Sequence, residues 1–413
     1  MSQVNKHKTA YEHSAIWPRN EQGEFTLNGQ PLSHVVASVG GTPCYLYDRQ
    51  RIGRRITQLK AMLPERLLLH YAIKANPMPA LVCALQPSVQ GFDVASSAEL
   101  RVALDSGMHS EHISFAGPGK QLAELEQAVA AGILIHVESF REVELLADLR
   151  KRYPLIRVSV RVNLPFELKA SGMKMSGGSK QFGIDAEYVP DMLERIQKYD
   201  LSFEGFHMFA GSQNLKSDAI VEVQRKSYEL TLEWVQHFGL SLKYLNLGGG
   251  FGIPYTVNDT SLDVEPIARQ LHDMDAELNV SHPHARLVIE LGRYLVGEAG
   301  VYVSRIIDKK ESRGKNFLII DGGMHQHLAA SGNFGQVIKR NYPLAINARH
   351  GDANEIATVV GPLCTPLDQL ADNATLHTAQ PGDLVVVFQS GAYGRSASPG
   401  LFLSHPEVRE ALV

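Results

Sequence analysis

The sequence predicts an α/β protein in which a (β/α)8 barrel of the TIM type is followed by an all-β domain. From about residue 66, short apolar runs alternate with longer segments of helical periodicity. Eight strand–helix units are the number that closes such a barrel. A doubly wound open sheet uses the same units and is the structural alternative. The predicted strands are LLLHYAIK (67–74), GFDVA (91–95), HISFA (112–116), ILIHV (133–137), IRVSVRVN (156–163), LSFEGFHMF (201–209), LKYLNLG (242–248) and ARLVIEL (285–291).

Helices are predicted between these strands. A helix over 121–131 is followed by Gly132, which suits the left-handed conformation of a C-terminal cap. Another begins at Ser139, where Glu142 stands at the capping-box spacing. A long helix is predicted over 218–238.

After residue 300 the helical rhythm stops, which predicts a separate β-rich domain. We expect the barrel to cover 42–300, and residues 1–41 plus 301–413 to form the β-rich domain. The extended-looking segment 24–48 is also expected to join the β structure. Segment 169–183 (KASGMKMSGGSKQFG) has little periodicity and is expected to be a mobile loop at the barrel mouth. The β-rich runs are VYVSRIIDKKES (301–312), NFLIID (316–321), EIATVVG (355–361) and DLVVVFQSG (383–391).

Composition narrows the class of protein. Of 413 residues, 44% are hydrophobic and 20% charged, which excludes a disordered chain. A formal charge of −4 gives no reason to expect nucleic acid or an acidic membrane surface as a partner. The three scattered cysteines form neither a disulfide framework nor a metal knuckle. The polar N-terminus lacks the apolar core of a secretion signal, and no run is long enough to span a membrane. A cytoplasmic protein is expected.

Chemically useful residues stand at the ends of the predicted strands, where barrel enzymes place their sites. Lys74 ends strand one, and an amine there either reaches solvent or is used covalently. Gly248 to Gly250 end strand seven and form either a tight turn or a phosphate cradle. Glu290 and Arg293 end strand eight and, taken alone, read as a surface ion pair. Together they indicate a phosphorylated aldehyde cofactor, and pyridoxal 5′-phosphate fits.

From Thr42 onward, the chain resembles the barrel-type (fold type III) pyridoxal-phosphate decarboxylases, the group of diaminopimelate and ornithine decarboxylases. This resemblance implies an alanine racemase-like architecture of barrel and β domain. It rests on motifs that occur in the family's order, namely YAIKANP (71–77), FDVASSAEL (92–100), GFHMFAGSQ (205–213), NLGGGFG (246–252), ELGR (290–293), GPLCTPLD (361–368) and GAYG (391–394).

The resemblance also implies roles for individual residues. Lys74 matches the lysine that binds the cofactor covalently, and Glu290 the acid paired with its ring nitrogen. Cys364 matches a thiol that a neighbouring subunit contributes to the site, where it would reprotonate the α-carbon or exclude the wrong proton donor; a buried structural thiol is the alternative. The remaining matches are the polar supports Asp93, Glu99 and Arg161, and the phosphate-binding set Ser212, Gly248, Gly249, Gly250, Arg293 and Tyr393.

Three departures from the family pattern lie near the cofactor. Phe209 occupies the position of a histidine that usually stacks on the cofactor ring, and His207 stands two residues earlier on the same strand face. Phe209 either stacks as a neutral aromatic or is a packed core residue. Asn246 replaces a common aspartate, and Leu291 replaces the proline of E-P-G-R. Neither of these last two changes abolishes the expected roles.

A fourth departure concerns the substrate. The family follows the cysteine with a carboxylate that binds a distal amine, whereas this chain has Thr365 and then Pro366. Another diamine-binding aspartate falls near Asn347, and Asp368 remains available. An ammonium without a carboxylate partner binds poorly in a closed site. The C-T-P-L-D variant resembles decarboxylases that act on acylated amino acids in siderophore assembly or on a carrier protein, so a modified, neutral or anionic side chain is expected.

Three alternative functions are also considered. Meso-diaminopimelate decarboxylase is the nearest alternative. A racemase would place an arginine at the ring nitrogen, which Glu290 argues against. A non-catalytic cofactor-binding or regulatory homologue is the alternative from another class, although the chain keeps the residues that such relatives lose. The resemblance implies a homodimer that shares its active sites, with no metal involved.

Overall fold

The computed structural model describes residues 16–167, 173–256, 258–334, 336, 339–347 and 353–413. Two compact units form within this part of the chain. The first comprises the described residues within 1–52, 254–261 and 296–413, and the second comprises 53–253 and 262–295. Among the described residues, no helix has both the length and the apolar character needed to cross a membrane.

The second unit is a closed barrel of eight parallel strands, which confirms the predicted fold class. Strand β7 pairs with β8 and closes the ring. Each predicted strand is present, although the first is shorter than expected and Lys74 lies in the 3-10 turn Ile73–Ala75 that follows it. The barrel strands are β4 (Leu68–Ala72), β5 (Gly91–Val94), β6 (Ile113–Phe115), β7 (Leu134–Val137), β8 (Arg157–Asn163), β11 (Ser202–Met208), β13 (Tyr244–Gly249) and β14 (Arg286–Leu291).

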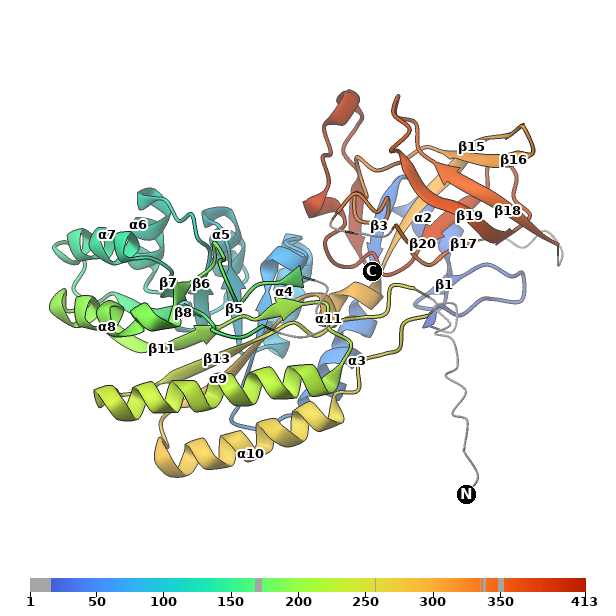
Figure 1. The fold of residues 1–413 in the computed structure, drawn as a ribbon. Coiled ribbons are helices and arrows are strands. Elements are labelled where there is room, and N and C mark those ends of the chain that lie inside the picture. Colours follow the sequence, from blue (N-terminus) through green and yellow to red (C-terminus); the bar gives the residue numbers. More distant parts are fainter. Residues whose placement is uncertain (1–15, 168–172, 257, 335, 337–338, 348–352) are drawn as a thin grey trace, which may run out of the picture. The chain divides into compact units, whose positions relative to one another are not determined.

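Helices connect these strands and lie outside them (Figure 1). Gly132 at φ 75° and Gly239 at φ 62° end two of these helices, as their positions predict. The Ser139 hydroxyl accepts from the backbone N–H of Glu142 at 3.3 Å and begins a third. The helices are α4 (Pro79–Leu85), α5 (Ser97–Asp105), α6 (Leu122–Ala131), α7 (Phe140–Arg150), α8 (Val189–Lys198), α9 (Ser217–Phe238), α10 (Glu265–Ser281) and α11 (Arg293–Val296), with α3 (Arg49–Lys60) before β4.

The barrel strands have two chemically different faces. Residues such as Leu69, Phe92, Val160 and Leu245 are buried and apolar, as expected of the face that packs on the helices. The alternate positions carry buried polar side chains, whereas barrel interiors are usually filled by branched aliphatic residues. This polar lumen consists of His70, Asp93, Ser114, His136, Ser159, His207, Asn246 and Glu290.

The first unit is β-rich, as the sequence predicts. Strand β3 pairs with β15 in this unit, so residues 44–47 join the β structure although the expected barrel range began at 42. The main sheet has the order β17-β20-β15-β16-β18-β19. Its elements are β3 (Cys44–Tyr47), β15 (Gly300–Ser312), β16 (Lys315–Ile320), β17 (Leu344–Ile346), β18 (Asn354–Val360), β19 (Gln369–His377), β20 (Leu384–Val387) and β21 (Arg409–Leu412), with β1 (Thr26–Leu27), β2 (Gln30–Pro31) and α2 (Leu32–Ser38) beside them.

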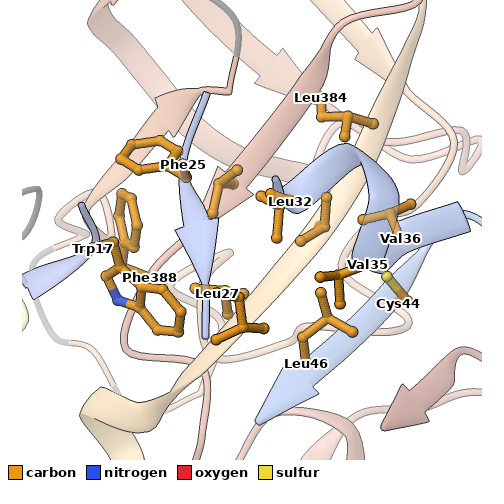
Figure 2. Close-up of a cluster of buried hydrophobic side chains, with 13 residues drawn as sticks. Trp17, Phe25, Leu27, Leu32, Val35, Val36, Cys44, Leu46, Leu384 and Phe388 are labelled. Atoms are coloured by element: carbon orange, nitrogen blue, oxygen red, sulfur yellow. The ribbon is translucent and has the colours of Figure 1, made fainter. Parts of the chain in front are cut away.

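A hydrophobic cluster joins the N-terminal segment to this sheet (Figure 2). Phe388 lies at one end of the cluster, with its ring centroid 5.2 Å from Phe25 and 6.3 Å from Trp17. The remaining side chains of the cluster come from β1, α2, β3, β15 and β20. Burial of this apolar surface is what holds the N-terminal segment on the sheet.

Phe388→Ala should lower the free energy of unfolding of the β-rich unit by about 3–5 kcal/mol, because it removes a buried ring and leaves a cavity. Trp17 lies in the cluster, so its fluorescence during urea unfolding, in a Trp234→Phe background, reports this unit. Ile356→Ala is the control, since that side chain is 61% exposed. Equal unfolding midpoints for the two variants would contradict the role of the cluster.

Candidate active site

The C-terminal ends of the barrel strands bring Lys74 and Phe209 together. Lys74 is exposed in the turn after β4, and Phe209 directly follows β11 and is buried. The Lys74 Nζ lies 5.2 Å from the centroid of the Phe209 ring. An accessible amine therefore stands beside an aromatic face, which is the surface that a planar cofactor ring needs for stacking.

Glu290 is a buried carboxylate near the end of β14 and has two polar partners. Its Oε1 lies 3.2 Å from His207 Nε2, and its Oε2 accepts from Asn246 Nδ2 at 3.4 Å. Burial alone raises the pKa of the Glu290 carboxyl, but His207, Lys74 and His136 together bring that pKa well below its usual value. The site therefore holds a buried anion.

His207 is buried in the barrel lumen. Its ring stacks on His136 with the centroids 4.3 Å apart and 18° between the planes. His136 Nδ1 lies 2.8 Å from the hydroxyl of Ser159. Burial, reinforced by His207, holds the pKa of His136 well below its usual value, so His136 is neutral. Of the two residues considered for stacking on a cofactor, Phe209 is the one beside the lysine.

The three glycines at the C-terminal end of β13, Gly248 and Gly249 within the strand and Gly250 just after it, leave no room for a side chain. A Cβ at Gly248 would lie 2.4 Å from the carbonyl oxygen of Met208, and one at Gly250 2.3 Å from that of Gly211. Both have positive φ, 68° and 81°. The N–H of Gly248 donates to Asn246 Oδ1 at 2.8 Å, so Gly248 contributes space to a cradle and not a free donor.

Ser212 lies next to this glycine surface. Its Cα is 3.8 Å from the position that a Cβ on Gly250 would take. The Ser212 hydroxyl oxygen is buried and has no hydrogen-bond partner among the described residues. A buried unsatisfied hydroxyl is costly, which indicates that an external acceptor or donor completes it.

The predicted polar supports lie around the same end of the barrel. Asp93 accepts from the Ser114 hydroxyl and lies 3.2 Å from His70 Nδ1. Glu99 accepts from the N–H of Ala95 at 2.7 Å, and burial raises the pKa of its carboxyl. Arg161 donates from Nη1 to Glu138 at 2.9 Å. Arg293 begins α11, directly after the strand that carries the buried acid.

Glu138 is a site residue that the sequence reading missed. Its carboxylate accepts from Arg161, from Gly117 N at 2.6 Å and from Gly183 N at 2.9 Å. Burial raises the pKa of Glu138, but Arg161 and Lys120 outweigh it and the pKa is lowered. Glu138 directly follows the apolar run ILIHV. Its position at the end of a predicted strand is the sequence feature that could have identified it as a site residue.

The expected loop 169–183 lies partly outside the described residues, which resume at Met173. From there β9 (Met173–Lys174) pairs with β12 (Gly211–Ser212). The end of the loop is held where Gly183 donates to Glu138. The described part is thus tied to the cradle and to the Arg161 ion pair.

The other predicted residues belong to the β-rich unit. Cys364 is exposed and free, in the turn between β18 and β19. Asp368 is buried, and its oxygens accept from Met324 N at 2.6 Å and Leu363 N at 2.8 Å. Asn347 is also buried, where it accepts from Phe25 N and donates to Glu24. These contacts favour structural roles for Asp368 and Asn347 over contact with substrate.

Two further predicted residues, Thr365 and Tyr393, also lie in this unit. Thr365 is partly buried, and its hydroxyl accepts from Leu367 N at 3.3 Å. Tyr393 has a positive φ of 54°, which is strained for an aromatic residue and typical of positions under functional constraint.

Asn246→Asp should destabilise the apoprotein increasingly as pH rises, because it places a second carboxylate beside Glu290. The pKa of Glu290 is lowered in the wild type, so its ionisation stabilises the fold above the unfolded-state pKa, and this is lost as pH falls. In the variant, repulsion between two ionised carboxylates makes the effect of ionisation unfavourable. The free energy of unfolding should therefore be lower than that of the wild type by on the order of 1–3 kcal/mol at neutral pH, and this difference should vanish in acid. Urea unfolding across pH measures it.

The control for this experiment is Asn246→Ala, which removes the same hydrogen bonds without adding a charge. Its loss of stability should vary much less with pH than that of Asn246→Asp. Parallel pH profiles for the two variants would show that the Glu290 carboxylate does not sense position 246.

The chain is similar in sequence to proteins of known activity. The family model "Pyridoxal-dependent decarboxylase, pyridoxal binding domain" matches residues 49–297. L-glutamyl-[BtrI acyl-carrier protein] decarboxylase of Niallia circulans is 37% identical over 90% of this chain and 88% of its own length. 2-[(L-alanin-3-ylcarbamoyl)methyl]-2-hydroxybutanedioate decarboxylase of Staphylococcus aureus is 31% identical over 91% of this chain and 96% of its own.

A solved structure agrees with these matches. Diaminopimelate decarboxylase from Helicobacter pylori, complexed with L-lysine, superposes with a TM-score of 0.83 at 26% identity, covering 92% of this chain and 94% of that one. The match to the family model extends over more than half of the chain, and the relatives match almost its full length. The chain therefore belongs to the fold type III family of pyridoxal-dependent decarboxylases.

Proposed function

We propose that this enzyme removes the α-carboxylate of an L-amino acid whose side chain is acylated or otherwise modified. This substrate class is supported by one observation. The turn between β18 and β19 that holds Cys364, all of it within the described residues, offers no free carboxylate for a distal amine. Thr365 stands where the family places an acid, and both oxygens of Asp368 are engaged by backbone N–H groups. A distal ammonium would lack its counter-ion here.

The relatives support this choice. The Niallia circulans and Staphylococcus aureus enzymes are named for a carrier-bound glutamyl group and a carbamoyl-linked alanine derivative. Neither of the named side chains ends in a free amine. Diaminopimelate decarboxylation is the second candidate, because relatives with that name match 95% of the chain.

The described residues fit pyridoxal phosphate on three independent observations. The glycine cradle next to the unsatisfied Ser212 hydroxyl suits a phosphate. The anionic Glu290 suits a protonated ring nitrogen. The Lys74 amine beside the Phe209 ring suits covalent attachment with stacking.

Roles for the chain's own residues follow. Lys74 holds the cofactor covalently, while Gly249, Gly250 and Ser212 bind its phosphate together with Arg293. Glu290 keeps the proton on the ring nitrogen, and Asp93, Glu99 and Arg161 support the lysine and the ring. The chemistry supplied by the bound cofactor is delocalisation of the electron pair left on the α-carbon when CO2 departs. The thiol of Cys364 then returns a proton to that carbon.

We further propose a homodimer in which each site takes Cys364 from the partner subunit. Its thiol is exposed, as a residue that works in a second subunit must be before assembly. Large apolar side chains are also exposed in the same unit, which is typical of a surface that becomes covered. They include Phe334, Leu367, Leu401, Phe402 and Leu403.

Lys74→Ala should abolish CO2 release, because the amine that holds the cofactor is lost. Lys198→Ala, which changes an exposed lysine on α8, should leave the rate unchanged. The assay panel is lysine, ornithine, meso-diaminopimelate, and glutamate and diaminopropionate with acylated side chains. We expect CO2 only from acylated substrates. Turnover of meso-diaminopimelate would refute the substrate class, and equal rates for the two variants would refute the role of Lys74.

Co-expression of Lys74→Ala and Cys364→Ala chains should restore activity that neither variant has alone. Random pairing makes half of the dimers hybrids with one intact site of two, so about a quarter of wild-type activity is expected. Each chain carries a different affinity tag, so hybrids can be isolated before assay. Pure hybrids without activity would refute the shared site.

A further inference from the structure

The carboxylate of Glu290 has a second layer of partners that the assigned site does not explain. Its first partner, His207 on β11, is 1% exposed. His136 on β7 stacks on that ring, although β8 lies between the two strands in the sheet. Ser159 on β8 holds His136 through Nδ1. A continuous row of polar side chains thus crosses the lumen and ends at Glu290.

Filling the barrel lumen with this row of polar side chains costs stability. His136 Nε2 and both ring nitrogens of His207 are buried and have no hydrogen-bond partner among the described residues, although His207 Nε2 lies 3.2 Å from Glu290 Oε1. A buried polar atom without a partner destabilises the fold, whereas branched aliphatic side chains would fill the same space without that cost. A purely structural role is therefore a poor explanation for two stacked imidazoles below a buried acid.

The charged groups around this row set the protonation states of Glu290 and His136. Burial raises the pKa of Glu290, but His207, Lys74 and His136 lower it further than burial raises it. Burial and His207 lower the pKa of His136, Glu290 raises it, and Lys120 and Arg161 lower it again. The His136 ring therefore stays uncharged and offers a neutral, flat surface to His207. His207 is the member of the row whose nitrogen faces the carboxylate, at 3.2 Å.

We propose that His207 and His136 are positioning residues of the decarboxylase: His207 presents its Nε2 proton to Glu290 and keeps that carboxylate anionic and correctly oriented, and His136 fixes the plane of His207. The catalytic consequence rests on the proposed function, because it acts through the acid at the ring nitrogen. The proton arrangement itself does not, and can be measured in the apoprotein.

The apoprotein experiment uses nitrogen-15 NMR of labelled histidines. The His207 signals are assigned by their loss in His207→Gln. We expect a proton on His207 Nε2 that is protected from exchange, and a shift of this nitrogen in Glu290→Gln. His109→Gln is the control, since that ring is exposed in the surface loop after α5. An unprotonated Nε2, or one that does not respond to Glu290→Gln, would overturn the proposal.

Kinetics separate positioning from packing. His207→Leu removes the donor and should lower kcat by about 10- to 100-fold with little change in KM, as losing an outer-shell partner of a metal ligand does. His207→Gln keeps a donor and should recover most of that loss. Equal losses in the two variants would overturn the proposal. If His207→Leu does not fold, His207→Gln and the NMR result still decide. A wild type inactive on every substrate would instead refute the proposed function.

Discussion

The architecture of the site depends on keeping one carboxylate charged inside a closed barrel. Moving an ion from water into a protein interior costs several kcal/mol unless charged and hydrogen-bonding partners replace the water. Glu290 has such partners from β11 and β13, with the positive charge of Lys74 nearby. Alternation along the strands explains how this is possible: one face packs on helices and the other is free to be polar. The fold and the chemistry therefore use opposite faces of the same strands.

Asn246 illustrates how one departure from a family pattern serves this constraint. An amide offers both a donor and an acceptor, and the structure uses both: Nδ2 faces Glu290 while Oδ1 holds the N–H of Gly248. An aspartate could accept from Gly248, but it would repel Glu290. The amide thus couples the acid to the glycine cradle, so the two ends of a bound cofactor would be positioned by one side chain.

Much of the fold was readable from the sequence because each barrel strand has a hydrophobic run and several helix ends have a local signal, such as Gly132, Gly239 and Ser139. The strand ends also placed Lys74, Glu290 and the glycines correctly at the C-terminal ends of their strands. Contacts that depend on three-dimensional packing were not readable. Asp368 looked available for substrate, yet it anchors its own turn to the backbone of Met324. Glu142 fitted a capping box by spacing, but its carboxylate pairs with Lys120.

The polar lumen was hidden for a related reason. His136 and Ser159 lie within apolar runs, where single polar residues look like interruptions of a core. Only closure of the barrel shows that these interruptions face one another. The most direct test of the account is the ionisation of Glu290 in the apoprotein, followed by carbon-13 NMR of labelled glutamate and assigned with Glu290→Gln. The account predicts a carboxylate that stays ionised well below the usual range of a glutamate. Titration at about pH 4.3, the value of a free glutamate, or above would contradict it.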